Sequence, residues 1–252
     1  MNRARIAAIA VIMGAAFAAP VMAEEMEYPK QNWSFEGPFG TYDRASAQRG
    51  FQIYKEVCSN CHSMKQVYYR NLEGIGLEPE QIKAIAASVD VPTIGDDGAP
   101  AERKGIPSDH FKAPYANEKA ARAAQNGALP PDQSVIIKAR EGGPDYIYAL
   151  LTGYEAPPAD MKMGDGMNYN KWFNGHQIAM AAPLTEGRVE YSDGTKPTLE
   201  QEARDITTFL AYVANPEMEE RKRMGVRVVL FLAFLSCVTY AVKRQIWSDV
   251  KH

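Results

Sequence analysis

Apolar side chains recur at helical spacing in several stretches of this chain, with long polar loops between them. Two stretches carry a clear apolar stripe: residues 46–57, around Phe51, and residues 198–213, around Phe209. The second opens at Thr198 with the spacing of a capping box. Shorter helices are predicted over residues 79–89, 117–127, 134–140 and 145–152, and a hairpin turn over residues 192–194. The pattern therefore predicts a mainly α-helical domain.

The most apolar segment lies near the carboxyl end, at residues 225–242, and contains no acidic residue. At about 1.5 Å per residue a helix of this length reaches roughly 27 Å, close to the ~30 Å of a bilayer core. A buried helix of a globular domain is the alternative. It is disfavoured because the segment is apolar all round and is bracketed by basic residues at 221–223 and 243–244. We predict a transmembrane anchor over residues 221–243.

The amino end has the features of a secretory signal peptide. Arg3 and Arg5 precede an apolar stretch, and small residues ending at Ala23 supply a cleavage site, so residues 1–23 are expected to be removed. Basic residues on the two sides of the carboxyl-terminal span are too evenly divided to orient it. Export of residues 24–220 would decide the orientation and leave residues 244–252 in the cytoplasm.

The predicted exported part, residues 24–220, is strongly acidic. It holds 19 Lys and Arg against 30 Asp and Glu, a net charge of about −11, whereas the whole chain has −3. Its length suits one domain, and its sign argues against a nucleic-acid partner. The charge either keeps the surface soluble or steers a basic partner, and charge alone does not decide between these. Candidate steering patches are Glu200 with Glu202, and Asp96 with Asp97.

The most specific motif is Cys58-Ser59-Asn60-Cys61-His62, a C-x-x-C-H run. Two cysteines at this spacing can add to the vinyl groups of one haem c, and the following histidine becomes an axial iron ligand. A redox dithiol has no need of His62, and a zinc site needs further ligands. The remaining cysteine, Cys237, lies in the apolar carboxyl-terminal segment. The motif therefore predicts one covalently bound haem.

The ligand on the other side of the iron is less certain from the residues alone. Met180 lies in a small, apolar segment that suits a buried thioether ligand, although it could equally be core filler. His176 is the next candidate. Further methionines lie in a polar segment rich in Gly and Asp, at Met161, Met163 and Met167.

Several segments resemble the cytochrome c1 family in order along the chain: residues 50–58, 121–132, 150–154, 178–181 and 221–225. The resemblance implies a class I cytochrome c-like haem domain with long loop insertions, plus one carboxyl-terminal transmembrane helix. In class I cytochromes the first and last helices cross. Gly50 with Phe51, and Phe209 with Tyr212, are the candidates for that crossing.

The resemblance also implies roles for single residues. Met180 would be the sixth iron ligand, opposite His62. Arg140 would pair with a haem propionate, Tyr146 would lie near the same pocket, and the Pro131 carbonyl would accept the ring N–H of His62. Some bacterial relatives tie the loop near the methionine with two extra cysteines. This chain has none, so its residues 161–167 need other support.

The function implied by the resemblance is electron relay within the cytochrome bc1 complex. The expected partners are cytochrome b, the Rieske iron–sulfur protein as donor and a basic c-type cytochrome as acceptor. The complex would be dimeric, in a bacterial inner membrane, with the haem domain in the periplasm. Two alternatives remain: a haem protein with an open iron site, which needs Met180 not to ligate, and a terminal-oxidase cytochrome, whose design would retain an amino-terminal anchor.

Overall fold

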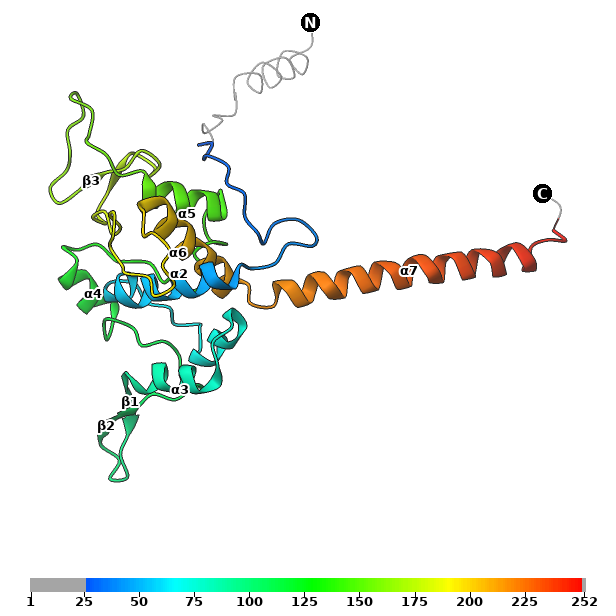
Figure 1. The fold of residues 1–252 in the computed structure, drawn as a ribbon, viewed down its shortest axis with the longest axis horizontal. Coiled ribbons are helices and arrows are strands. Elements are labelled where there is room, and N and C mark those ends of the chain that lie inside the picture. The colour runs from blue at the N-terminus through cyan, green and yellow to red at the C-terminus, as the bar shows by residue number, and fades with distance from the viewer. Residues whose placement is uncertain (1–25, 251–252) are drawn as a thin grey trace, which may run out of the picture.

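The computed structural model describes residues 26–250, so the predicted signal peptide, residues 1–23, lies outside the described residues. The α-helices are α2 (Arg44–Glu56), α3 (Pro79–Ala87), α4 (Glu118–Ala124), α5 (Gly143–Thr152), α6 (Leu199–Ala214) and α7 (Met218–Ile246). Two 3₁₀ helices are η1 (Cys58–Asn60) and η2 (Tyr69–Ile75). The strands form two antiparallel pairs, β1 (Asp90–Ile94) with β2 (Pro100–Lys104) and β3 (Asn168–Tyr169) with β4 (Gln177–Ile178). Figure 1 shows a helical body from which α7 projects alone, which confirms the predicted mainly α fold class.

The centre of the domain is the predicted crossing of α2 and α6. At Gly50 the backbone of α2 comes so close to α6 that an added Cβ would lie 2.7 Å from the Cβ of Phe209. The rings of Phe51 and Phe209 lie 5.6 Å apart, and Phe209 is fully buried. Tyr212 lies one turn further on, edge to face with Tyr42 at 5.5 Å. The glycine therefore permits the close approach, and the aromatic rings fill the space beside it.

A buried ion pair fixes the same crossing from its polar side. Asp205 on α6 is fully buried and accepts hydrogen bonds from Ser46 at 2.7 Å and from Arg49 Nε at 2.8 Å, both on α2. Gln201 donates to the same carboxylate at 3.0 Å. A buried carboxylate is tolerated when each of its oxygens has such partners. The register of α2 on α6 is thus specified by polar as well as apolar contacts.

Two local predictions are wrong. Residues 134–140 form a run of turns and not a helix, because the backbone bonds to a neighbouring loop, as from Gln133 N to Ser63 O at 2.8 Å. At residues 192–194 the chain turns, but no paired strands flank the turn. There, side chains take the place of a strand partner: Val189 N donates to Glu202 at 3.1 Å and Gln52 donates to Glu190 O at 3.0 Å.

The chain also contains a hairpin that its pattern did not predict. Strands β1 and β2 pair Asp90 with Lys104 and Pro92 with Glu102, and the arm extends away from the body (Figure 1). Its strands lack alternation of apolar and polar residues, and most of their side chains are exposed. An ion pair of 2.9 Å between Lys104 and Asp90 closes its base.

The carboxyl-terminal helix is longer than the predicted span and contains it. α7 has 29 residues, which at 1.5 Å each gives roughly 44 Å. It is long and apolar enough to cross a membrane, and none of its most apolar stretch is buried against the described domain. Only Met218, at its start, is buried.

Candidate haem site

The C-x-x-C-H motif lies on the tight turn that follows α2. Cys61 N and His62 N both donate to the carbonyl oxygen of Cys58, at 3.1 and 2.8 Å. The two intervening side chains cap the end of α2: Ser59 Oγ donates to Lys55 O at 2.8 Å, and Asn60 Nδ2 donates to Glu56 O at 3.0 Å. These bonds satisfy carbonyl groups that a helix end leaves free. Both thiols and the imidazole are therefore held on one short, well-braced turn.

The imidazole of His62 is oriented from its far side. Its Nδ1 atom lies 2.8 Å from the carbonyl oxygen of Pro131, to which a protonated Nδ1 donates. That tautomer leaves Nε2 unprotonated and available to a metal. Burial lowers the pKa of His62, although the Pro131 carbonyl and Asp132 oppose the shift. A neutral imidazole is the form that ligation requires.

The segment that carries Pro131 is tied to the segment after His62. Asp132 accepts from Ser63 Oγ at 2.7 Å and from Lys65 N at 2.9 Å, and Ser134 Oγ accepts from Gln66 N at 3.0 Å. Burial alone would raise the pKa of Asp132, but hydrogen bonds from Ser134, Lys65 N and Ser63 to its carboxylate outweigh burial, and the pKa is lowered. No local pattern in the sequence indicates this role of Asp132, so it was missed.

Further supports of the motif were also missed. Gln125, just after α4, lies 3.5 Å from Cys61 Sγ and donates to the Tyr115 hydroxyl at 2.7 Å. The Tyr54 hydroxyl on α2 donates to His62 O at 3.4 Å. No spacing in the sequence indicates these contacts. Gln125 does fall within residues 121–132, one of the segments that carries the resemblance.

The thiols do not have the environment of a redox dithiol or of a zinc site. Burial raises the pKa of Cys58 to about 12, whereas an attacking thiol of a redox dithiol needs a lowered pKa. Within residues 26–250 no three His, Cys, Asp or Glu side chains converge to hold a metal ion. The raised pKa of the Cys58 thiol, beside an imidazole whose Nδ1 faces the Pro131 carbonyl, fits covalent haem better than a redox dithiol.

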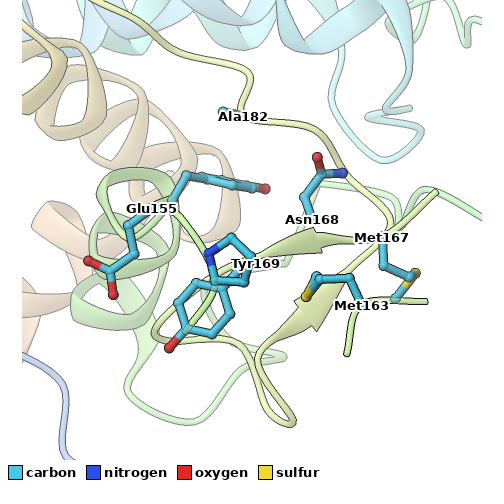
Figure 2. Close-up of a pocket in the computed structure, with 8 residues that line it drawn as sticks. Glu155, Met163, Met167, Asn168, Tyr169 and Ala182 are labelled. Atoms are coloured by element: carbon cyan, nitrogen blue, oxygen red, sulfur yellow. The ribbon is translucent and has the colours of Figure 1, made fainter. Parts of the chain in front are cut away.

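The Met180 segment follows β4 and is held by Tyr154, whose hydroxyl donates to Met180 O at 3.0 Å. Met180 itself is partly buried against the apolar core. Met163 and Met167 instead line a cavity of about 410 Å³, together with Glu155, Tyr169 and other residues (Figure 2). None of Cys58, Cys61 and His62 lines that cavity.

The loop over residues 161–167 is supported by one side-chain amide. Gln177 accepts from Gly164 N at 2.8 Å and donates to Lys162 O at 3.4 Å, so that both ends of its amide are used. The backbone of the neighbouring His176 has a φ of 60°, which is unusual for a residue with a side chain. Its Nδ1 is buried without a hydrogen-bond partner.

Arg140 and Tyr146 are brought together by a glycine turn. Tyr146 on α5 is buried, and burial raises its pKa while the nearby Arg140 guanidinium opposes the shift. Arg140 is exposed and bonds to Ala139 O at 3.1 Å. Gly142 lies between them with a φ of 78°. The guanidinium thus stands at the surface beside a buried phenol, free to pair with an anionic group.

One of the two acidic patches considered as docking sites is not a surface patch. Glu202 is fully buried on α6, so the pair Glu200 with Glu202 cannot act as one docking surface. Asp96 and Asp97 are exposed, but they lie at the tip of the β1–β2 arm. Glu155 is also exposed, and it lines the cavity beside Met163 and Met167. It directly follows Tyr154, whose hydroxyl donates to Met180 O, so it is closer to the Met180 segment than the tip of the arm is in sequence.

Comparison with known proteins covers nearly all of the described chain. The sequence profile of the Cytochrome C1 family matches residues 33–250. A protein named cytochrome c1 from Rhodospirillum rubrum is 45% identical over 240 residues, which are 88% of this chain and 88% of the relative. "Cytochrome c1, heme protein, mitochondrial" of Saccharomyces cerevisiae is 47% identical over 88% of this chain and 73% of the relative. "Cytochrome b-c1 complex catalytic subunit, mitochondrial" of Candida albicans is 45% identical, with 89% and 78% covered.

Proposed function

Because this chain belongs to the cytochrome c1 family, we propose that it is the haem-bearing, electron-transferring subunit of a quinol:cytochrome c oxidoreductase, the cytochrome bc1 complex. The names of the relatives support this assignment: the yeast relative is called a heme protein, and the Candida relative is called a subunit of a cytochrome b-c1 complex. No bond of a substrate is made or broken in this subunit. Its part in the enzyme is to pass on electrons.

The observation that carries the proposal is the contact between His62 Nδ1 and the Pro131 carbonyl, on the same turn as two half-buried thiols. We propose that Cys58 and Cys61 would hold one haem c through thioethers, and that His62 Nε2 and the Met180 sulfur would bind its iron. When bound, the haem supplies a reversible one-electron step. The chain's own residues fix the imidazole and offer a soft sulfur that favours the reduced iron.

The propionate side of the haem is assigned to Arg140 and Tyr146. A guanidinium pairs with a carboxylate through two parallel hydrogen bonds, and the buried Tyr146 beside it keeps the neighbourhood partly dry. This pairing would offset the negative charge of the propionate. The position of Arg140 supports the proposal, because its guanidinium is exposed at the surface, next to Tyr146, where an anionic group can reach it.

In the proposed route the Rieske iron–sulfur protein, reduced by quinol at cytochrome b, delivers the electron to this subunit. A basic c-type cytochrome, soluble or tethered, then removes it. The acidic domain supports a basic acceptor, since its net charge over residues 24–220 is about −11. The complex is proposed to be a dimer, as the resemblance to the cytochrome c1 family implies.

The topology follows from the two apolar ends of the chain. Residues 1–23 are proposed to direct export and be cleaved, residues 24–220 to form the periplasmic haem domain, and residues 221–243 to anchor it. Residues 244–252 would then be cytoplasmic, and the membrane would be the inner membrane of a bacterium. The length and apolar character of α7 support the anchor.

Purification of the tagged full-length chain from native membranes tests this proposal. We expect a multi-span b-type cytochrome and an iron–sulfur protein to copurify, and quinol to reduce the covalent haem of the preparation. A chain that purifies alone, and whose reduced haem binds carbon monoxide, would instead indicate an open iron site. Retention of an uncleaved amino-terminal anchor would favour the terminal-oxidase alternative.

A further inference from the structure

The loop before α2 presents an exposed aromatic side chain that the haem site does not explain. Phe39 has 79% of its surface exposed, more than any other large apolar side chain reported for residues 26–250. It sits at the tip of the loop over residues 35–40, hereafter the Phe39 loop, between Pro38 and Gly40. A single exposed apolar ring is not unusual in itself, so the position of this one relative to α7 decides what it indicates.

The Phe39 loop is fastened to the first turns of α7. Lys222 Nζ donates to the carbonyl oxygens of Phe35 at 2.6 Å and Gly40 at 3.1 Å, one at each end of the loop. One turn earlier, Glu219 accepts from Tyr42 N at 2.8 Å and pairs with Arg44 at 2.9 Å. Figure 1 shows this loop, in blue, bulging toward the start of α7. The loop therefore cannot move independently of that helix.

The attachment lies at the level where the apolar stretch of α7 begins. Lys222 precedes Gly225 by three residues, a rise of about 4.5 Å along the helix. Val226, one turn beyond Lys222 on the same face, is 36% exposed, whereas Val229 and Leu230 are each 65% exposed. If α7 spans a bilayer, the Phe39 loop thus stands at the boundary between head groups and acyl chains.

The backbone of the loop directs the ring outward. Gly37 has a φ of 70°, which favours glycine, and Gly40 approaches the Glu36 carbonyl too closely for any side chain. Thr41 N donates to Ser34 O at 2.9 Å and closes the base of the loop. Phe39 is consequently presented by a small, closed turn and not by a loose strand of chain.

We propose that the Phe39 loop is an interfacial anchor, with Phe39 inserted into the surface of the same bilayer that α7 crosses. Aromatic side chains are enriched at this depth, where an apolar ring leaves water while the loop's carbonyls stay hydrated. Together with α7 it makes a second attachment, which limits the tilt of the haem domain over the membrane. A lipid surface is the proposed partner because the loop is fastened through Lys222 to α7 where the apolar stretch of that helix begins. The inference rests on the proposed membrane span of α7.

The test uses nitroxide labels on the full-length holoprotein in phosphatidylcholine nanodiscs. The first of three samples carries the label on Phe39→Cys in a Cys237→Ser background. The second carries the label on the native Cys237, which is exposed in the apolar part of α7. A third sample, Ile94→Cys in the same background, is the matched control, since Ile94 is 74% exposed on the distant β1–β2 arm. Power saturation with oxygen and with a water-soluble nickel chelate reports the depth of each label.

We expect the label at position 39 to be shielded from nickel and accessible to oxygen, at a depth between those at positions 94 and 237. A label at position 39 as accessible to nickel as that at position 94 would overturn the inference while leaving the span intact. So would a label shielded from both reagents in the purified complex, which would show a protein partner. If the label on Cys237 is itself fully accessible to nickel, the span fails as well.

Discussion

Gly50 and Phe209 lie at the point where α2 and α6 cross, and an added Cβ at residue 50 would come within 2.7 Å of the Phe209 Cβ. The Asp205 carbonyl oxygen is closer still. We therefore expect Gly50→Ala to push the two helices apart and to lower the free energy of unfolding by roughly 1–3 kcal/mol, the usual cost of overpacking. Denaturant unfolding of the holoprotein, followed by circular dichroism, measures the loss.

The matched control is Gly225→Ala, at a helical glycine with nothing within 4 Å of its added Cβ. It should leave stability unchanged or raise it slightly, since alanine has the higher helix propensity. Equal stability of Gly50→Ala and the wild type would mean that the crossing can relax and that the glycine is not required.

The second prediction concerns Glu202, which is buried with one carboxylate oxygen unpartnered. Burial raises the pKa of Glu202 above its ordinary value of 4.5, against the opposing hydrogen bonds from Val189 N and Arg188 N. The folded state thus favours the neutral acid. The stability that the folded state gains from holding Glu202 protonated is fully present below pH 4.5. It is lost as the pH rises through the raised pKa of Glu202.

Glu202→Gln keeps the shape and cannot ionise. Its melting temperature should therefore rise relative to the wild type as the pH increases above about 4.5, with a constant difference below that. Glu200→Gln, on the exposed face of the same helix, is the control and should show no such trend. A difference in melting temperature between wild type and Glu202→Gln that stays constant from below pH 4.5 to neutral pH would contradict the raised pKa of Glu202.

The third prediction concerns docking of the electron acceptor. If the acidic surface steers a basic cytochrome, the second-order rate of oxidation should fall steeply with salt, because the Debye length shrinks from roughly 30 Å at 0.01 M to about 10 Å at 0.1 M. Glu155→Gln should lower the rate at low salt and flatten this dependence, since Glu155 follows the tyrosine that holds Met180.

Stopped-flow mixing measures that rate. The control is Asp97→Asn, at the tip of the β1–β2 arm, because it removes one negative charge just as Glu155→Gln does. Its rate should follow that of the wild type at every salt concentration. A rate that salt leaves flat in the wild type would show that the charge only keeps the domain soluble. An effect of Asp97→Asn equal to that of Glu155→Gln would place docking elsewhere.

The fourth prediction concerns the sixth ligand. Met180→Leu preserves the apolar volume, so the change in stability from packing should stay below about 1.5 kcal/mol. Haem attachment should persist, while the far-red sulfur-to-iron charge-transfer band disappears and the midpoint potential falls, because a ligand that favours reduced iron is lost. Met167→Leu, in the cavity that Met163 and Glu155 also line, should keep both the band and the potential. The reverse result would move the ligand to Met167.

Periodic and capped elements could be predicted from the sequence, because their determinants are local. Asp43, Asn117 and Thr198 each accept a backbone N–H at the start of a helix, as their side chains favour. Residues 134–140 have a similar pattern, yet they form turns because Ser134 accepts from Gln66 N, and that partner is 68 positions away. No local pattern contains such a contact.

The motif Cys58–His62 could also be predicted from local sequence, but most of the side chains that hold it in place could not. Asp132, Gln125 and Tyr54 reach it from three different segments, and only the folded chain brings them together. Pro131 was named because of the resemblance and not from spacing. The hairpin arm was missed since its strands are polar and contain prolines, Pro92 and Pro100.

The central claim is that Cys58 and Cys61 carry a covalent haem, and one measurement tests it most directly. The holoprotein is denatured, extracted with acidic acetone and separated by mass. Haem should remain on a band at about the mass of residues 24–252, and Cys61→Ala with Cys58→Ala should abolish that retention. Haem that extracts freely from the wild-type chain would contradict the account.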